Sequence, residues 1–486
     1  MTPFEIAKPE IFLLIALCLV LLLDLFFRKE SQVLTYLTAQ LALLSTTLLT
    51  YGTSFSKGER MVGLDRMYML DDFAGMLKIA VLLMTSMFFI YARKYLRDHD
   101  SWRGEFFVLS MTATLGAMIM VSGHHLLVLY LGLEMMSLSL YALIAMRRDD
   151  VKATEAAMKY FILGAVASGL LLYGMSLLYG LSSTLMLESL ETYFVVQQQQ
   201  DGILSNMPLM LALVFIVAGL AFKLGIVPFH MWLPDVYQGA PTPITLFLSG
   251  VPKLAVFALM LRLLAGSLET AASSWSQLWL LLGLASVILG NIVAIAQTSL
   301  KRMFAYSTIA HMGFIVMGVL TASHAGYSAA LFYMLVYALM SMGGFAILIL
   351  LGHKAYDAEM LDDIRGLNAR HPWMAFVMML ILLAMMGFPF TAGFYAKLSI
   401  VQAVVGADLI GPAVVLVVMS VIGAFYYLRV IKLMYFDNPS ADAQPVQAGF
   451  DFCLLLSVNG LLMLGLGILP GGLMSVCSAV LSASGL

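Results

Sequence analysis

Apolar runs of about twenty residues recur along the whole chain, and this repetition limits the possible fold more than any other feature. A helix needs roughly 20 apolar residues to cross a hydrocarbon core about 30 Å thick. Hydrophobic residues make up 62% of the 486 residues and charged residues only 11%, with a mean hydropathy of +0.95. A water-soluble core of this length would need far more polar surface to cover it. The sequence therefore predicts an all-α polytopic membrane protein.

About fourteen runs are long enough to form membrane helices. We expect them over 11–27, 33–53, 72–92, 105–122, 125–146, 156–181, 207–227, 243–266, 276–297, 302–321, 326–352, 372–404, 409–436 and 450–480. Most connections are short. The exceptions are 182–206, expected to be a solvated loop because it contains QQQQ, and the charged connector 355–372.

Lysine and arginine are distributed unevenly between the two sides of this arrangement. Connections after odd-numbered helices hold roughly three times as many of these cations as the other side, which makes them cytoplasmic by the positive-inside rule. Both termini are then expected on the outer side, because the number of helices is even. The cytoplasmic set includes Arg28, Lys29, Arg93, Lys94, Arg97, Arg147, Arg148 and Lys354, and the outer set Lys8, Lys57, Arg60, Arg66 and Arg262.

Several classes of site and partner are disfavoured by the composition. The three cysteines, Cys18, Cys453 and Cys477, lie in separate apolar runs without a CxxC pair, so they do not predict an iron–sulfur or zinc site. No basic tract suits nucleic acid, and the formal net charge is −2. The first apolar run lacks a small-residue cleavage site and is expected to be a retained helix.

Charged side chains inside the apolar runs are the main functional signal. Each costs at least about 2.5–3.5 kcal/mol at the middle of a membrane, and the default interpretation is an ion or proton path facing the bundle interior. Most are lysines, which suits proton handling, because burial lowers a lysine pKa and a nearby carboxylate raises it again, whereas arginine stays charged. The group comprises Asp24, Lys78, Glu134, Lys159, Lys223, Lys253 and Lys397.

Simpler structural explanations exist for four of these side chains. Asp24 lies near the cytoplasmic end of the first helix, where an interfacial position is the alternative. Glu134 is also explained as a carboxylate hydrogen-bonded to a small residue such as Ser137. Lys159 is equally explained by an i,i+4 pair with Glu155 near the interface. For Lys78 we favour a side chain that snorkels to the membrane surface.

The segment AFKLGIVPFHMWLPDVYQGAPTP, residues 221–243, predicts an interrupted seventh helix. Pro228 has no backbone N–H, so the carbonyl of Leu224 loses its helical partner. In lipid, this is tolerated only where the backbone lines a cavity or is held by protein and water. His230 is suited to relaying protons near neutral pH, although a re-entrant interfacial loop without a relay role is the alternative.

A second interruption is predicted in LLAMMGFPFTAGFYAKLSI, residues 382–400, where Gly387, Pro389 and Gly393 precede Lys397. The seventh and twelfth helices lie five apart, and an odd spacing reverses membrane direction. A five-helix unit used twice therefore predicts two inverted repeats around a transport site. The expected divisions are 1–104 (helices one to three), 105–270 (helices four to eight), 271–436 (helices nine to thirteen) and 437–486 (helix fourteen).

Three further candidates lie in the eighth and tenth helices. Lys253 directly follows Pro252, which is expected to kink the eighth helix. Lys301 lies near the cytoplasmic start of the tenth helix, where a positive-inside anchor is the alternative. His311 is roughly three turns deeper. A buried histidine whose hydrogen bonds are all made within the core is equally expected there.

Five segments together resemble the antiporter-like membrane subunits of respiratory complex I, and PDVYQGAPTP is most similar to the N-type members. The segments are FKLGIVPFHMWLPDVYQGAPTP, LGLEMMSLSLYAL, KRMFAYSTIAHMGF, DIRGLNARHP and GFPFTAGFYAK. The resemblance covers nearly the whole chain. It implies a proton-translocating subunit of a bacterial inner-membrane NADH:quinone oxidoreductase. The proton-path residues that it implies are Glu134, Lys159, Lys223, His230, Lys253, Lys301, His311 and Lys397.

Within this set, the resemblance implies that Glu134 pairs with Lys223, that Lys253 links two half-channels and that Lys397 lies near the outlet. It places NADH, FMN, iron–sulfur clusters and quinone in partner subunits of the membrane and peripheral arms, with no cofactor in this chain. Pro252 and Lys78 depart from the family pattern. The rivals are a cation/proton antiporter or membrane-bound hydrogenase subunit of the same superfamily, and a non-conducting structural subunit.

Overall fold

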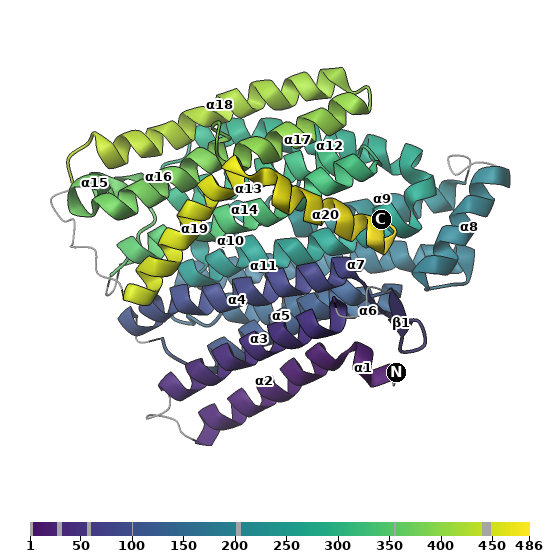
Figure 1. The fold of residues 1–486 in the computed structure, drawn as a ribbon, viewed down its shortest axis with the longest axis horizontal. Helices are drawn as coiled ribbons and strands as arrows, with labels where there is room; N and C mark the ends of the chain where they lie inside the picture. Colours follow the sequence, from purple (N-terminus) through teal and green to yellow (C-terminus); the bar gives the residue numbers. More distant parts are fainter. Residues whose placement is uncertain are drawn as a thin grey trace.

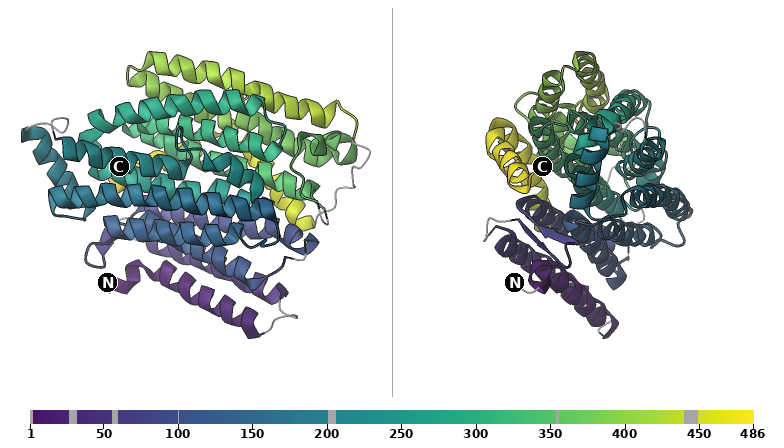
Figure 2. Two further views of the ribbon diagram at one scale, coloured as in Figure 1. Left: turned by 180° about the vertical axis from the view of Figure 1, so that it is seen from behind. Right: turned by 90° about the vertical axis from the view of Figure 1, so that its right-hand side faces the viewer.

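The computed structural model describes residues 3–26, 32–55, 60–99, 101–200, 206–353, 356–439 and 449–486. Its apolar helices lie side by side, with α2 (Lys8–Phe26) and α3 (Gln32–Ser54) at one edge and α18 (Ile410–Tyr435) at the opposite edge (Figure 1, Figure 2). Four cations used above to predict orientation, Arg28, Lys29, Lys57 and Lys354, lie outside these described residues.

Twelve helical segments within the described ranges are long and apolar enough to cross a membrane. Besides α2, α3 and α18, they are α4 (Asp72–Asp98), α5 (Gly104–Ser122), α6 (Leu126–Ile144), α7 (Val151–Ser182), α9 (Met207–Leu224), α11 (Thr242–Leu261) with the π-helical turn η2 (Arg262–Ser267), α12 (Ala272–Ile295) with the 3-10 turn η3 (Glu269–Ala271), α14 (His324–Leu351) and α19 (Phe450–Ile468). The other two expected segments contain α13 (Leu300–Val319) and the pair α16 (Pro372–Met386) and α17 (Ala392–Gly406).

The remaining helices lie at the chain ends and in the connections. At the ends are α1 (Pro3–Ile6) and α20 (Pro470–Ser484), and in the connections are α8 (Leu187–Gln200), α10 (Trp232–Gly239), η4 (Leu361–Ile364) and α15 (Leu367–Arg370). The expected all-α polytopic architecture is thus present with one addition, an antiparallel hairpin of β1 (Met61–Gly63) and β2 (Tyr68–Leu70) between α3 and α4.

Both chain ends lie at the same end of the bundle, together with β1 and α8, while α15 lies at the opposite end (Figure 1). We call these the α8 end and the α15 end. An even number of crossings requires the two termini to share one side. The cation distribution predicts that the α15 end faces the cytoplasm.

The centre of the bundle is formed by α11 and α14. The most apolar windows of the segment Thr242–Ser267 and of α14 are 100% and 94% buried, against 28% for α2 and for α18. A helix that is apolar all round belongs in such an interior. The peripheral helices expose large side chains such as Leu14, Leu48 and Val421, which suits contact with lipid.

Two expectations about connections and helices are wrong. Residues 182–206 contain the helix α8 rather than only a solvated loop, because Leu187, Leu190 and Phe194 form one apolar face that is buried beneath it. The segment 450–480 is not one helix. Pro470 begins α20 directly after Leu469, since proline cannot continue the helical hydrogen bonds of the preceding turn.

Lys78 does not snorkel. Its side chain is 0% exposed, and its Nζ lies 2.6 Å from Oε1 of Glu10, whose side chain is 6% exposed. Tyr68 adds a hydroxyl 3.3 Å from the ammonium and a ring centroid 5.1 Å from it. The side chain is therefore neutralised inside the protein, between α2, β2 and α4.

Arg262, which the sequence places in the outer set of cations, also belongs to a buried ion pair. It is buried in η2 and donates to both carboxylate oxygens of Asp71, at 2.7 and 2.8 Å. Burial favours a higher pKa for Asp71, but the charge and hydrogen bonds of Arg262 hold that pKa below its ordinary value. This bidentate ion pair, with two parallel hydrogen bonds, joins the start of α4 to the end of α11.

Candidate functional site

The first predicted interruption is present, but Gly225 rather than Pro228 ends the helix. Gly225 has a φ of 77°, a left-handed conformation that glycine adopts without strain. Its N–H donates to the carbonyl of Phe222 at 2.9 Å, and the N–H of Ile226 donates to that of Ala221 at 2.8 Å. These bonds close the end of α9, and Pro228 stands in the gap before α10.

Carbonyl groups left open at this break are bound by side chains from neighbouring segments. The ammonium of Lys253, on α11, donates to the carbonyls of Lys223 and Leu224, at 3.1 and 2.7 Å. The indole N–H of Trp232 donates to Phe222 at 2.9 Å, and its ring lies 5.0 Å from the Lys253 Nζ. The Leu224 carbonyl that was expected to lose its partner is therefore held by a buried cation, as an interrupted helix in lipid requires.

Lys223 itself is buried and donates to the hydroxyl of Ser137 at 3.0 Å. Glu134 acts on Lys223 electrostatically, but its Oε1 is buried without a hydrogen-bond partner among the described residues. The hydroxyl of Ser137 is thus a partner of Lys223, and Oε1 of Glu134 does not bind it. Since α6 carries both side chains three positions apart, Ser137 and Glu134 lie on the same helical face toward Lys223.

Two further lysines lie at the other end of the interruption. Lys301 is buried at the start of α13 and donates to the carbonyl of Ala240, directly after α10, at 3.2 Å. Lys159 makes the expected local pair with Glu155 at 2.7 Å and also an ion pair with Asp235 of α10 at 2.9 Å. Its side chain is 42% exposed, so in this chain it is not buried as Lys223, Lys253 and Lys301 are.

His311 lies in a chain of hydroxyl groups in the second half of the molecule. Its two ring nitrogens lie 2.8 Å from the hydroxyl of Tyr333 and 3.1 Å from that of Tyr427. Tyr427 also bonds Ser307, one turn earlier on α13. A hydroxyl can donate or accept, so this satisfied core histidine also forms a continuous polar chain.

The second interruption has the same arrangement of glycine and lysine as the first. Gly387, with a φ of 85°, ends α16, and the ammonium of Lys397 donates to the carbonyl of Met386 at 2.8 Å. Lys397 also donates to the hydroxyl of Ser420 at 3.0 Å and lies 5.3 Å from the ring of Phe314. At both breaks, a glycine stops the helix and a lysine binds the carbonyl that is left open.

His230 does not join these contacts. Its side chain is buried, yet Nδ1 lacks a hydrogen-bond partner in the described part of the chain. The sequence reasoning also missed the hydroxyl partners Ser420, Tyr333 and Tyr427, and it considered Ser137 only as a partner of Glu134. For Ser137, the spacing of three from Glu134 was the available signal, whereas Ser420 and Tyr427 become neighbours of their partners only through folding. No group of three or more His, Cys, Asp or Glu side chains placed to hold a metal ion occurs among the described residues.

Comparison with known proteins identifies the family. Residues 123–423 match the family model described as NADH:quinone oxidoreductase/Mrp antiporter, TM. NADH-quinone oxidoreductase subunit N of Thioalkalivibrio sulfidiphilus is 49% identical, covering 98% of this chain and 97% of the relative. The same subunit of Thiobacillus denitrificans is also 49% identical, over 99% and 98%. This chain belongs to the subunit N family of NADH-quinone oxidoreductases.

Solved structures agree with membership of the subunit N family, and the predicted resemblance is confirmed. A chain of respiratory complex I from Thermus thermophilus, solved with bound aureothin, has a TM-score of 0.81 and 31% identity, covering 97% of this chain and 99% of that one. A chain of the Mrp complex from Dietzia has a TM-score of 0.85 at 19% identity, over 99% and 97%, and shows the fold alone. All eight candidate residues, from Glu134 to Lys397, lie within the range matched by the family model.

Proposed function

We propose that this chain is a proton-translocating membrane-arm subunit of an NADH:quinone oxidoreductase and that its buried lysines carry the proton path. One observation supports this most directly. Lys253, Lys301 and Lys397 each donate to a backbone carbonyl at an end of an interrupted segment. A purely structural subunit has no need for cations buried at such a cost, whereas a proton path needs ionisable groups inside the membrane.

The proposed mechanism uses two states of these contacts. When Glu134 approaches Lys223 the ammonium is favoured, and when it withdraws the lysine releases its proton. Lys253 passes protons between the halves, His311 and its hydroxyl chain conduct them onward, and Lys397 releases them. Moving one charge against 100 mV costs about 2.3 kcal/mol. This free energy must come from a change elsewhere in the complex that stabilises one of the two states more than the other.

The wider assignments follow from this proposal. The partners are the other membrane-arm subunits and the peripheral arm, in a bacterial inner membrane, and both termini lie on the periplasmic side. NADH, FMN, iron–sulfur clusters and quinone belong to partner subunits, and this chain carries no redox centre. The repeats occupy 105–270 and 271–436, following the N-terminal unit 1–104 and preceding the C-terminal unit 437–486.

Replacing Lys223 is the direct test. We expect Lys223→Ala to lower the rate of coupled proton pumping by roughly 10²-fold or more, as loss of a proton-transferring side chain does. Lys223→Arg should fail similarly, because arginine keeps the positive charge but does not release its proton. The measurements are the rate of NADH-driven proton pumping, normalised to the amount of assembled complex, and the number of protons pumped per NADH oxidised, both in inverted membrane vesicles.

Lys432→Ala is the matched control, because this lysine is exposed near the end of α18 and should pump as the wild type does. Wild-type pumping by both Lys223 variants would contradict the proton-path assignment and support the structural rival. Sodium-dependent transport by the wild-type protein would favour the antiporter rival instead.

A further inference from the structure

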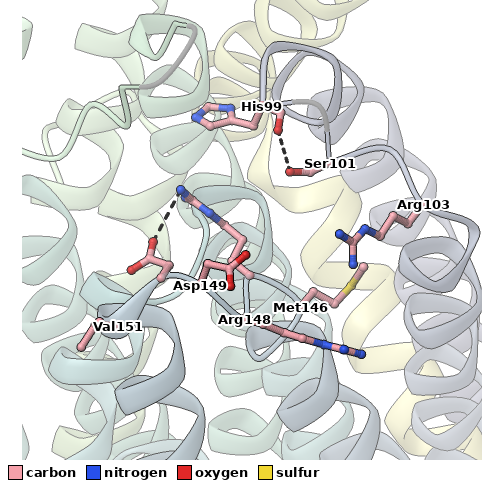
Figure 3. A pocket seen from close by; sticks show the side chains of 9 residues that line it. His99, Ser101, Arg103, Met146, Arg148, Asp149 and Val151 are labelled. Carbon is pink, nitrogen blue, oxygen red and sulfur yellow. Dashed lines mark hydrogen bonds and ion pairs between the residues drawn. The ribbon is translucent and has the colours of Figure 1, made fainter.

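A cavity of about 860 Å³ opens at the α15 end, between the end of α4, the start of α5 and the turn that joins α6 to α7. Figure 3 shows His99 and Ser101 on one side of it, with Met146, Arg148 and Asp149 across from them. The cavity admits many water molecules and faces the predicted cytoplasmic side. It lies outside the set of residues assigned to the proton path above.

His99, at the inner wall, is held so that both ring nitrogens face acceptors. Nε2 lies 3.2 Å from Oδ1 of Asp357, and Nδ1 lies 3.2 Å from the backbone carbonyl of Tyr95. The ring stacks on that of Tyr95, with centroids 4.0 Å apart. A backbone carbonyl only accepts hydrogen bonds, so the bond to Tyr95 places a hydrogen on Nδ1. Nε2 lies at ion-pair distance from Asp357, where a proton on this nitrogen would face a carboxylate.

Asp357 is a fixed negative charge beside this ring. Its Oδ2 accepts from Arg147 at 2.9 Å and from the hydroxyl of Tyr95 at 3.1 Å. Burial favours a higher pKa for Asp357, but the hydrogen bond from His99 and the charges of Lys301 and Arg147 hold that pKa well below its usual range. The carboxylate stays ionised at physiological pH, so the negative charge beside the ring is constant.

The connection that carries Asp357 is anchored on both sides of the residue. Before it, the ammonium of Lys94 donates to the carbonyl of Gly352 at 2.6 Å. After it, the N–H of Leu300, next to Lys301, donates to the carbonyl of Glu359 at 2.6 Å. Asp357 is thus held between α4 and the start of α13. Among the charged groups around Lys301, Asp357 acts on it most strongly.

A narrow crevice of about 30 Å³ continues inward from the cavity. The two share Ser101, Met146 and Arg147, and the crevice ends at Pro241. Pro241 follows Ala240, whose carbonyl binds Lys301. The volume is enough for one or two water molecules. The lining is mostly apolar, and Ser101 and Arg147 stand where the crevice meets the cavity.

We propose that His99 is the loading residue of a proton inlet that leads from this cavity, past Asp357, to Lys301, with Asp357 as its positioning residue. The inference rests on the proton translocation proposed above and gives it a specific cytoplasmic starting point. A proton taken from the cavity water binds the imidazole ring. It leaves through water in the crevice, and the ring is then reloaded from the cavity.

The charged and titratable groups on the elements around the ring must be considered for its pH dependence. Among the described residues, they are Tyr95, Lys94 and Asp98 of α4, Arg103 before α5, Arg147, Arg148, Asp149 and Asp150 of the turn before α7, Asp357 and Glu359 of the connection after α14, and Lys301 of α13. Asp357 is the acid in direct contact with the ring. Its removal should therefore change the pH profile more than any other single substitution.

The test measures NADH-driven proton pumping by the assembled complex in inverted vesicles between about pH 6 and pH 9, a range that spans the ordinary titration of histidine. We expect His99→Gln to reduce the coupled rate about tenfold, less than for a buried relay residue, because water also reaches the crevice. His99→Arg should be equally impaired, since arginine keeps the charge beside Asp357 but releases no proton.

For Asp357→Asn, we expect the coupled rate to fall off at a pH lower by about one unit than in the wild type, because the protonated ring loses its counter-charge. Asp357→Glu should restore the wild-type profile. Arg148→Gln, at an exposed arginine lining the same cavity, should leave rate and profile unchanged.

Lys223→Ala, measured in parallel, separates the two proposals. If it abolishes pumping while both His99 variants and Asp357→Asn behave as the wild type, the inlet proposal is wrong and the proposed function stands. If Lys223→Ala also pumps normally, the proposed function fails. A fully active His99→Arg variant would overturn the loading role on its own, even if His99→Gln failed to assemble.

Discussion

Glu10→Ala is expected to destabilise the protein by about 3–5 kcal/mol, because it leaves Lys78 as a buried charge without a partner. The pair is among the most deeply buried in the described chain, with side chains 6% and 0% exposed and a separation of 2.6 Å. Tyr68 supplies one hydrogen-bonding hydroxyl but no negative charge. The loss should appear as a lower temperature of thermal unfolding for the purified complex in detergent.

A double substitution shows whether the charge or the packing is responsible. Glu10→Leu with Lys78→Met removes both charges at similar volume and should recover most of the lost stability, since paired apolar replacements of buried ion pairs are often neutral. Glu5→Ala is the control, because this nearby glutamate is exposed. Equal unfolding temperatures for Glu10→Ala and Glu5→Ala would contradict the assigned role of the pair.

Gly393→Ala is expected to destabilise the second interruption by about 3 kcal/mol, at the upper end of the usual range for overpacking. A Cβ at Gly393 would overlap the carbonyl group of Ala384, which is backbone and cannot rotate away. The start of α17 would have to move from the end of α16. Lys397, one turn later, would then lose its 2.8 Å bond to the carbonyl of Met386. Both unfolding temperature and proton pumping should therefore fall.

Gly406→Ala provides the comparison within the same helix. Nothing lies within 4 Å of a Cβ built at Gly406, so the change should be neutral or stabilise α17 by up to about 1 kcal/mol through helix propensity. If Gly393→Ala matched Gly406→Ala in stability and pumping, close approach at the break would not be what positions Lys397.

Much of the site was predictable because lipid penalises the groups that form it. A lysine in an apolar run, or a proline and glycines within one, has few structural explanations in a membrane helix. Lys223, Lys253 and Lys397 were identified in this way, and each contacts an interruption or the hydroxyl group beside it. The role assigned to each remains a prediction.

Features that depend on distant contacts were predicted less well. Lys78 looked like a snorkelling side chain because its partner, Glu10, lies 68 positions earlier in another helix. The helix α8 looked like a loop because its polar glutamines dominate its composition, although three apolar side chains form a buried face. Asp357 was an unremarked acid of a connector until the fold placed it between His99 and Arg147.

The sequence by itself determined that this is a multi-helix membrane protein with two interrupted helices and ionisable groups at membrane depth, because hydrocarbon tolerates neither long polar surface nor open backbone groups without compensation. Only the tertiary structure decided which partner each group has. Lys253 binds the carbonyl of Leu224, 29 positions away, and Lys301 that of Ala240, 61 positions away. Hydrogen bonds act over about 3 Å, so such partners exist only after the helices have packed together.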